Sequence, residues 1–272
     1  MPAALGAVPL AALALVLSQR GPPPPRPGEL VVSFLDVGQG DATLLQRDGA
    51  SLLVDTGPPG GPILRRLAEA GVERLDALLI THAEADHEGM ALEVIRGFRP
   101  RLVLDGGAGW PTAVQRGLPA TRVRTVAAHA GQELTLGGVR LRLLWPPPPT
   151  PGWRPDGNPN DRAVVALASA GPFDLLLPAD AESTVTASLD LPDVEALKVA
   201  HHGSDDPGLP ALLERTRPEF AAIEVGRNTY GHPTPSTLTA LRAAVPRVMR
   251  TDRDGTVRLY VAGATARVVR AG

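Results

Sequence analysis

Short apolar runs separated by turn residues recur along the chain from Leu30 onward. Runs of four to six apolar residues, such as Leu30–Leu35 and Ala77–Ile80, have the length and composition of buried strands. Apolar residues at helical spacing follow Pro62 and His87. The pattern predicts helices at 62–70, 87–98, 209–216 and 235–244, another after 180, and strands at 30–35, 42–46, 51–55, 76–81, 101–104, 122–127, 139–144, 163–168, 173–177, 196–200, 220–225, 248–251 and 256–261. Because strands and helices alternate throughout 30–272, this range is predicted to form one α/β domain.

The first 29 residues differ in composition from the rest. Residues 1–20 are mostly apolar, and 21–29 form a Pro-rich linker of polyproline type. The apolar segment falls short of the ~20 residues of a spanning helix and suits a signal peptide core. Signal peptide, membrane anchor, last membrane helix of a longer protein and disordered tail all remain open, and the first three predict an extracytoplasmic, secreted or membrane-anchored domain.

Composition narrows the possible chemistry. The chain has no cysteine, which excludes disulfides and thiolate-bound zinc, so that any metal ion must be held by histidines and carboxylates. A net charge of −2 argues against a wholly basic nucleic-acid binder. Arginines nevertheless concentrate in two segments, with eight against two acids in 96–142 and seven against two acids in 240–272.

Four potential metal ligands follow the strand predicted at 76–81. They are His82, Glu84, Asp86 and His87. Strand ends open onto the functional edge of α/β folds, and an extended backbone would send residues 82, 84 and 86 to one side. The alternative is a helix start that Asp86 caps, with His87 incidental.

Other predicted strands end in the same way. Asp55 follows an apolar run before a glycine, Asp180 follows Leu175–Leu177, and His201 and His202 follow 196–200. A single acid at such a place is often only a cap or turn residue. Four strand ends with ligand-type residues together predict a metal site.

These motifs resemble the metallo-β-lactamase-like domain of the ComEC/Rec2 family of DNA-uptake (competence) proteins. The resemblance covers about residues 30–260. It rests on Phe34-Leu35-Asp36-Val37-Gly38-Gln39-Gly40-Asp41-Ala42, Val54-Asp55-Thr56-Gly57, the His82–His87 motif, His201-His202-Gly203-Ser204, Tyr230-Gly231-His232-Pro233 and Thr251-Asp252-Arg253-Asp254-Gly255.

The resemblance implies an α/β fold of four layers, an αββα sandwich, with one or two divalent ions (Zn²⁺ or Mn²⁺) at one edge of its two sheets. It implies His82 and Glu84 as ligands of one ion and Asp86 with His87 as ligands of the other.

The resemblance also implies roles for residues outside that motif. Asp180 is expected to bridge the ions, and His201 or His202 to supply a further ligand. The other expected roles are orientation of the ligands by Asp55, positions near the site for Asp36 and Asp41, and catalysis by Asp86, Asp180 and His232.

Two positions depart from the family pattern. Glu84 stands where the superfamily has His and this branch often Asp, and its longer side chain could reposition one ion. In Asn158-Pro159-Asn160-Asp161-Arg162-Ala163, Ala163 replaces the usual Ser. Lys198, the single lysine, is given no role.

Three functions remain open. A metal-dependent phosphodiesterase or nuclease acting on DNA during uptake would use the arginine-rich segments to bind the backbone, with salt-sensitive affinity. Its partners would be DNA, a membrane channel or competence proteins on other chains, and the membrane through residues 1–20. A small-molecule hydrolase of the same fold, acting on a lactone or phosphoester under the loop 146–157, would be insensitive to salt. A catalytically silent module that binds DNA or a partner is the third.

Overall fold

The computed structural model describes residues 25–150, 157–263 and 265–271. The segment predicted at 1–20 and part of the linker therefore lie outside the described residues, as do residues 151–156 of the Pro-rich loop. Within the described ranges, no helix combines the length and the apolar character needed to cross a bilayer.

The described residues form two packed sheets. One sheet has the order β15-β14-β1-β2-β3-β4-β5-β6 and the other β13-β12-β11-β10-β9-β8-β7. The first contains β1 (Leu30–Phe34), β2 (Thr43–Arg47), β3 (Ala50–Val54), β4 (Ala77–Ile80), β5 (Leu102–Asp105), β6 (Thr125–Ala127), β14 (Thr256–Ala262) and β15 (Thr265–Ala271). The second contains β7 (Glu133–Leu136), β8 (Val139–Trp145), β9 (Val165–Ala170), β10 (Phe173–Leu177), β11 (Ala196–Lys198), β12 (Phe220–Ile223) and β13 (Arg247–Arg250).

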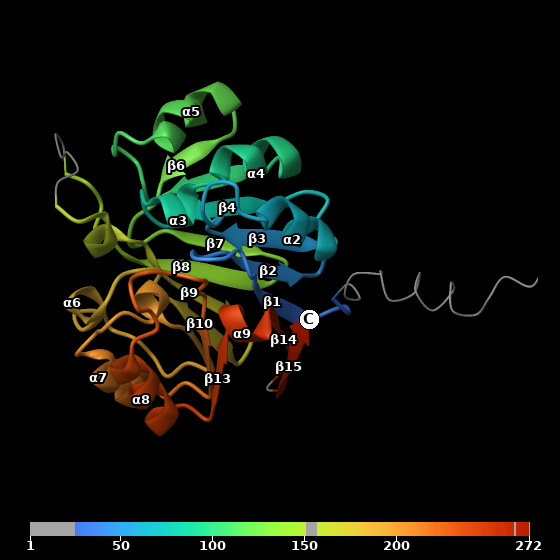
Figure 1. Cartoon of the computed structure of the whole chain (residues 1–272). Helices are drawn as coiled ribbons and strands as arrows, with labels where there is room; N and C mark the ends of the chain where they lie inside the picture. The colour runs from blue at the N-terminus through green and yellow to red at the C-terminus, as the bar shows by residue number, and fades with distance from the viewer. Residues whose placement is uncertain (1–24, 151–156, 264, 272) are drawn as a thin grey trace, which may run out of the picture.

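Helices cover both outer faces of the paired sheets (Figure 1). On the first sheet lie α2 (Ile63–Glu69), α4 (Ala91–Phe98) and α5 (Ala113–Thr121); on the second lie α6 (Ser183–Thr186), α7 (Leu209–Thr216) and α8 (Pro235–Ala244). Single turns occur at α3 (Ala85–Glu88), η1 (Pro159–Arg162), η2 (Ala200–Gly203) and α9 (Thr251–Asp254). The architecture is the predicted four-layer αββα sandwich.

Three apolar layers hold these four layers together. Alternate residues of β1, such as Val32 and Phe34, pack between the sheets, where Phe34 stacks on Phe220 of the second sheet at 5.9 Å between ring centroids. A second layer joins the first sheet to α2, α4 and α5, and a third joins the other sheet to α6, α7 and α8. Strands such as β1, β4, β9 and β12 are therefore buried on both faces, which explains why they read as continuous apolar runs.

Several predicted elements have different limits in the structure. The helix predicted at 87–98 begins earlier and divides into α3 and α4, and Thr251, predicted to end a strand, begins α9. The strand predicted at 122–127 is confined to β6, while α5, β7 and β15 were not predicted. The strands β6, β7 and β15 lie at sheet ends, where exposed residues such as Glu133 and Thr135 weaken the apolar signal.

Three loops are bonded together at the edge where β3 and β4 end. The backbone N–H of Asp41 donates to the carbonyl of Asp86 at 3.1 Å, and that of Thr56 donates to the carbonyl of His87 at 2.7 Å. Gly40 has a φ of +142°, and a Cβ there would overlap the carbonyl oxygen of Asp86. Only glycine combines this backbone conformation with so close an approach.

Gly40→Ala is therefore expected to lower the free energy of unfolding by at least about 1–3 kcal/mol. The matched control is Gly97→Ala within α4, where no atom lies within 4 Å of the added methyl; this change should stabilise by about 0.5–1 kcal/mol. Urea denaturation of both variants measures the difference. Equal effects of the two substitutions would contradict the close approach at Gly40.

Candidate metal centre

The candidate site lies at the edge where β3, β4, β10 and β11 end, here called the site edge. β3 pairs with β4 and β10 pairs with β11 in parallel, so each pair brings its carboxyl ends to the same edge of its sheet. Asp55 follows β3, His82 follows β4, and Asp180 lies three residues beyond the last residue of β10. The topology thus brings together segments that are far apart in the sequence.

The imidazole of His82 is oriented by Thr81 and Asp55. The Thr81 hydroxyl donates its single hydrogen to Asp55 Oδ2 at 2.7 Å and lies 3.0 Å from His82 Nδ1. Since that hydrogen is used, Nδ1 of His82 must carry the proton and Nε2 must present a lone pair. Nε2 is buried without a hydrogen-bond partner in the described part of the chain. Burial lowers the pKa of His82 to about 3, helped by the neighbouring His87, so this ring is neutral.

His87 is held in the same way. Its Nδ1 lies 2.9 Å from Asp55 Oδ2, and its Nε2 lies 3.2 Å from Asp180 Oδ1. Burial alone would lower the pKa of His87, but Asp180 and then Asp41 outweigh it and raise the pKa well above its usual value. Both Nε2 and Asp180 Oδ1 lack a partner in hydrogen-bond geometry within the described residues. Two bases facing each other at this distance require a proton or a metal ion between them.

His202 and Asp86 lie on the other side of Asp180. Nδ1 of His202 lies 2.8 Å from the carbonyl oxygen of Glu224, and because a carbonyl can only accept, Nδ1 donates this hydrogen bond. Nε2 of the same ring faces Asp86 Oδ2 at 3.2 Å and Asp180 Oδ2 at 3.8 Å. Burial opposes protonation, yet Asp180 and Asp41 raise the pKa of His202 to about 10. The acids therefore attract positive charge to this ring as well.

His201 and His232 form the more exposed side of the site. Glu182 Oε1 lies 2.7 Å from Nδ1 of His201, leaving Nε2 3.8 Å from Asp180 Oδ2 and 3.4 Å from the amide nitrogen of Asn160. The His232 ring stands edge-on to that of His201 at 5.4 Å. Burial, and then the charge of His201, lower the pKa of His232. His232 therefore lies beside the cluster.

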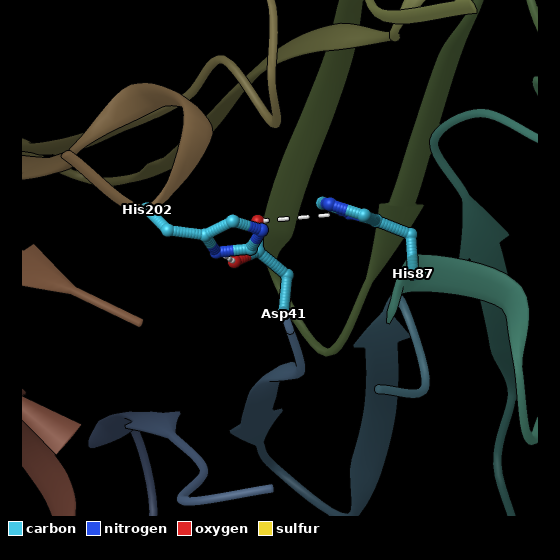
Figure 2. A group of neighbouring side chains, drawn as sticks. All are labelled: Asp41, His87 and His202. Atoms are coloured by element: carbon cyan, nitrogen blue, oxygen red, sulfur yellow. Dashed lines mark ion pairs between the residues drawn. The ribbon is translucent and has the colours of Figure 1, made fainter. Parts of the chain in front are cut away.

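Asp41 lies between His87 and His202, with its carboxylate near both rings (Figure 2). Its carboxylate lies 3.8 Å from Nδ1 of His87 and 3.2 Å from Nδ1 of His202, and it forms a short ion pair with Lys198. Burial would raise the pKa of Asp41, but the charges of Lys198, His202 and His87 together outweigh burial and hold the pKa well below its usual range. Lys198 Nζ also donates to the carbonyl of Ala179 at 3.0 Å and lies 3.7 Å from Asp180 Oδ1.

Among the described residues, two groups of three have ligand atoms close enough to hold an ion: His82, His87 and Asp180; and Asp41, His87 and His202. The first group presents three buried atoms without a hydrogen-bond partner in the described ranges, and the second presents one that the first lacks, Asp41 Oδ1. The second already contains the Lys198 ammonium, and its close contacts use the Nδ1 nitrogens that Asp55 and Glu224 engage. The first group, extended by Asp86 and His202 Nε2, therefore fits divalent ions better.

The structure places two other candidate residues differently from the expectation. Asp36 makes its contacts outside the cluster, where its carboxylate pairs with Arg66 at 3.0 Å and accepts from the N–H of Gly38 at 3.3 Å, so it supports its own loop. Glu84 is half-buried, and burial with the charge of Asp86 raises its pKa, but it belongs to neither group of three. The alternation expected over 82–86 ends at Glu84, since Asp86 and His87 lie in the turn α3.

Sequence reasoning missed Lys198, Glu182 and Glu224. Lys198 is the last residue of a buried apolar strand, and a lysine there needs a buried counter-ion. That signal alone could have drawn attention to it. Glu182 and Glu224 gave no such signal in the sequence. Each contacts the Nδ1 atom of a histidine that only the fold brings near.

The comparisons with known proteins agree with this geometry. Residues 35–153 match the model of the metallo-beta-lactamase superfamily. The two-sheet fold is also that of YhfI from Bacillus subtilis, a metallo-beta-lactamase fold protein, with a TM-score of 0.60, 14% identity, and coverage of 86% of this chain and 99% of that one. The chain has the metallo-β-lactamase fold.

The chain is also similar to a part of two longer curated relatives. It is 30% identical to the competence protein ComA of Neisseria gonorrhoeae over 95% of this chain and 36% of the relative. It is 28% identical to the ComE operon protein 3 of Bacillus subtilis over 84% of this chain and 32% of the relative. The chain thus spans about a third of the length of these relatives. It is similar to a part of each relative, and its metallo-β-lactamase fold implies divalent metal ions and metal-dependent hydrolysis.

Lys198→Met tests the buried ion pair. The substitution leaves the Asp41 carboxylate buried without its cation, and we expect it to lower the free energy of unfolding by about 3–5 kcal/mol in the presence of a chelator. Adding Asp41→Asn should recover much of that loss, and urea denaturation of the two single variants and the double variant measures the coupling. Additive losses would show that the pair contributes no interaction energy.

Glu88, next to His87, provides a pH test. It is buried, and burial raises its pKa to about 7, although Thr112 and Gln115 donate hydrogen bonds that lower it. The folded protein therefore retains a proton that the unfolded chain releases near pH 4.5, so Glu88 destabilises the fold as pH rises from there through 7.

Glu88→Gln should remove this cost. In the metal-free protein, the stability of the variant relative to wild type should increase from pH 5 to pH 8 by roughly 1–3 kcal/mol. Urea denaturation at the two pH values measures this change. A constant difference between the proteins would contradict the raised pKa.

Proposed function

We propose that this domain is a metal-dependent phosphodiesterase that cleaves DNA during uptake. The observation that carries the proposal is the convergence of His82 Nε2, His87 Nε2 and Asp180 Oδ1, three buried ligand atoms that make no hydrogen bond in the described part of the chain. Three bases oriented at one point in the interior fit a divalent cation and would be costly without one.

Two sets of residues would hold ions, and both include Asp180. His82, His87 and Asp180 would hold one ion, to which the partly buried Glu84 could add a carboxylate; Asp86, His202 and Asp180 would hold the other. Asp180 lies between them because its two oxygens face different histidines. Imidazoles with several carboxylates suit Zn²⁺ or Mn²⁺, and one ion or two can be held.

Residues around the ions complete the chemistry. A bound divalent ion acidifies water and polarises a phosphoryl oxygen. Asp55 orients both rings, through Thr81 for His82 and directly at Nδ1 for His87, so that Nε2 of each would face an ion. His232 is neutral near pH 7 because its pKa is lowered, and it can accept or return a proton at the exposed side.

Two further observations favour DNA over a small phosphoester or lactone. The relatives are competence proteins. Tyr230, with 73% of its surface exposed, lies 5.9 Å from the His232 ring and offers a flat face on which a base can stack. On this proposal the domain works outside the cytoplasm with the remaining competence proteins, and residues 1–20 bring it to the membrane.

Asp180→Asn tests the proposal, with Asp193→Asn as control because Asp193 is an exposed surface acid. We expect purified wild type and control to bind one or two ions per chain and to cleave a DNA oligonucleotide in Mn²⁺ or Zn²⁺. Asp180→Asn should lose bound ion and reduce cleavage more than about 100-fold. Elemental analysis and gel-based cleavage measure the two effects.

Two other outcomes of this experiment would support the alternative functions. Bound ions without cleavage of DNA would favour the small-molecule hydrolase. A chain that binds no divalent ion but binds DNA would favour the catalytically silent module.

A further inference from the structure

The two arginine-rich segments lie differently with respect to the site edge. β5 runs parallel to β4 and β6 parallel to β5, so Arg101 and Arg124, which precede these strands, lie at the opposite edge. β13 runs parallel to β12 and β12 parallel to β11, so Arg250, the last residue of β13, lies at the site edge. The C-terminal segment therefore has Arg250 at the site edge, whereas Arg101 and Arg124 of 96–142 lie at the opposite edge.

A groove of about 430 Å³ gathers four arginines of the C-terminal segment. Its lining includes Arg242 of α8, Arg250 of β13, Arg253 of α9 and Arg270 of β15, with Asp254 among them. We call it the arginine groove. It lies along the edge strand of the second sheet, beside the last strand of the first.

The arginine groove is connected to the metal centre by hydrogen bonds. The Glu224 carbonyl that orients His202 is followed by Val225, whose N–H donates to the Thr251 hydroxyl at 2.8 Å. Thr251 begins α9, which carries Arg253. Two strand spacings, roughly 10 Å, separate β13 from the strand of Lys198. A substrate with a single phosphodiester at the metal centre is too short to span this distance, whereas a short oligonucleotide can span it.

Charge in the arginine groove is only partly neutralised. Arg250 pairs with Asp252 at 2.7 Å and Arg270 with Asp254 at 3.2 Å. Arg242 and Arg253 are exposed and have no acid within 4.0 Å in the described part of the chain. Guanidinium groups bind phosphate oxygens through paired N–H donors. The described lining contains no aromatic ring, so the groove suits a backbone more than a stacked base.

We infer that the arginine groove binds the phosphate backbone of a DNA strand whose scissile phosphate lies at the metal centre. This inference rests on the proposed function and extends it, because it gives the enzyme a polynucleotide substrate that crosses β12 and β13. Binding there is independent of base sequence and depends on salt.

The test compares Arg242→Ala/Arg253→Ala with the control Arg96→Ala/Arg124→Ala, which removes two exposed arginines elsewhere on the molecule. Binding of a fluorescein-labelled twelve-residue oligothymidylate is followed by anisotropy from 0.05 to 0.2 M salt in Ca²⁺. The groove variant should bind several-fold more weakly at 0.05 M. Its slope of log affinity against log salt should be shallower by about 1.4, because each single-strand phosphate that an arginine neutralises contributes about 0.7 to the slope.

Cleavage provides a second readout. We compare kcat/KM for the oligonucleotide with kcat/KM for bis(p-nitrophenyl) phosphate, a substrate that is too small to reach the groove. The ratio of the first value to the second should fall at least threefold in the groove variant, because the KM for the oligonucleotide rises. The control should keep the wild-type ratio and salt slope. Equal affinity and slope for the groove variant and the control would overturn the inference. If wild type cleaves neither substrate, the proposed function fails, and the anisotropy comparison still decides whether the groove binds DNA.

Discussion

The site depends on the hydrogen bonds that fix the protonated nitrogen of each histidine. Thr81, Asp55, Glu224 and Glu182 each engage an Nδ1. The Nε2 atom of each ring is therefore the one that faces the site, and those of His87, His201 and His202 lie within 4 Å of one buried carboxylate, that of Asp180. Such an arrangement of lone pairs is unfavourable by itself and becomes favourable only around positive charge.

The fold supplies this arrangement by joining loops of both sheets. Asp55 and the His82–His87 segment come from one sheet, and Asp180, His201 and His202 from the other. Backbone hydrogen bonds from Asp41 and Thr56 to the turn α3 fix the first set before any ligand binds. Phe34 of the first sheet stacks on Phe220 of the second, and this packing helps to fix the distance between the two groups of site residues.

Much of the fold was predictable because the strands are buried on both faces. The helices at 209–216 and 235–244 were predicted with the limits that the structure shows. At the site, the sequence was enough to identify Asp180, His201 and His202 as candidates, because each follows an apolar run. The different positions of His201 and His202 could not, because they depend on positive φ angles in η2 that turn the two rings toward different partners. Asp36 resembled Asp41 in the sequence, but only the folded loop shows that one pairs with Arg66 and the other with Lys198.

The ammonium of Lys198 has a consequence for the order of events in biogenesis. Several buried carboxylates cluster near this edge, and a nascent domain would have to assemble them against mutual repulsion. The Lys198 ammonium is part of the polypeptide from synthesis onward. The negative charge of the buried carboxylates is therefore partly neutralised whether or not the surrounding compartment supplies ions. Maturation can then proceed in two stages, with the polypeptide reaching its compact form first and capturing its inorganic components afterwards.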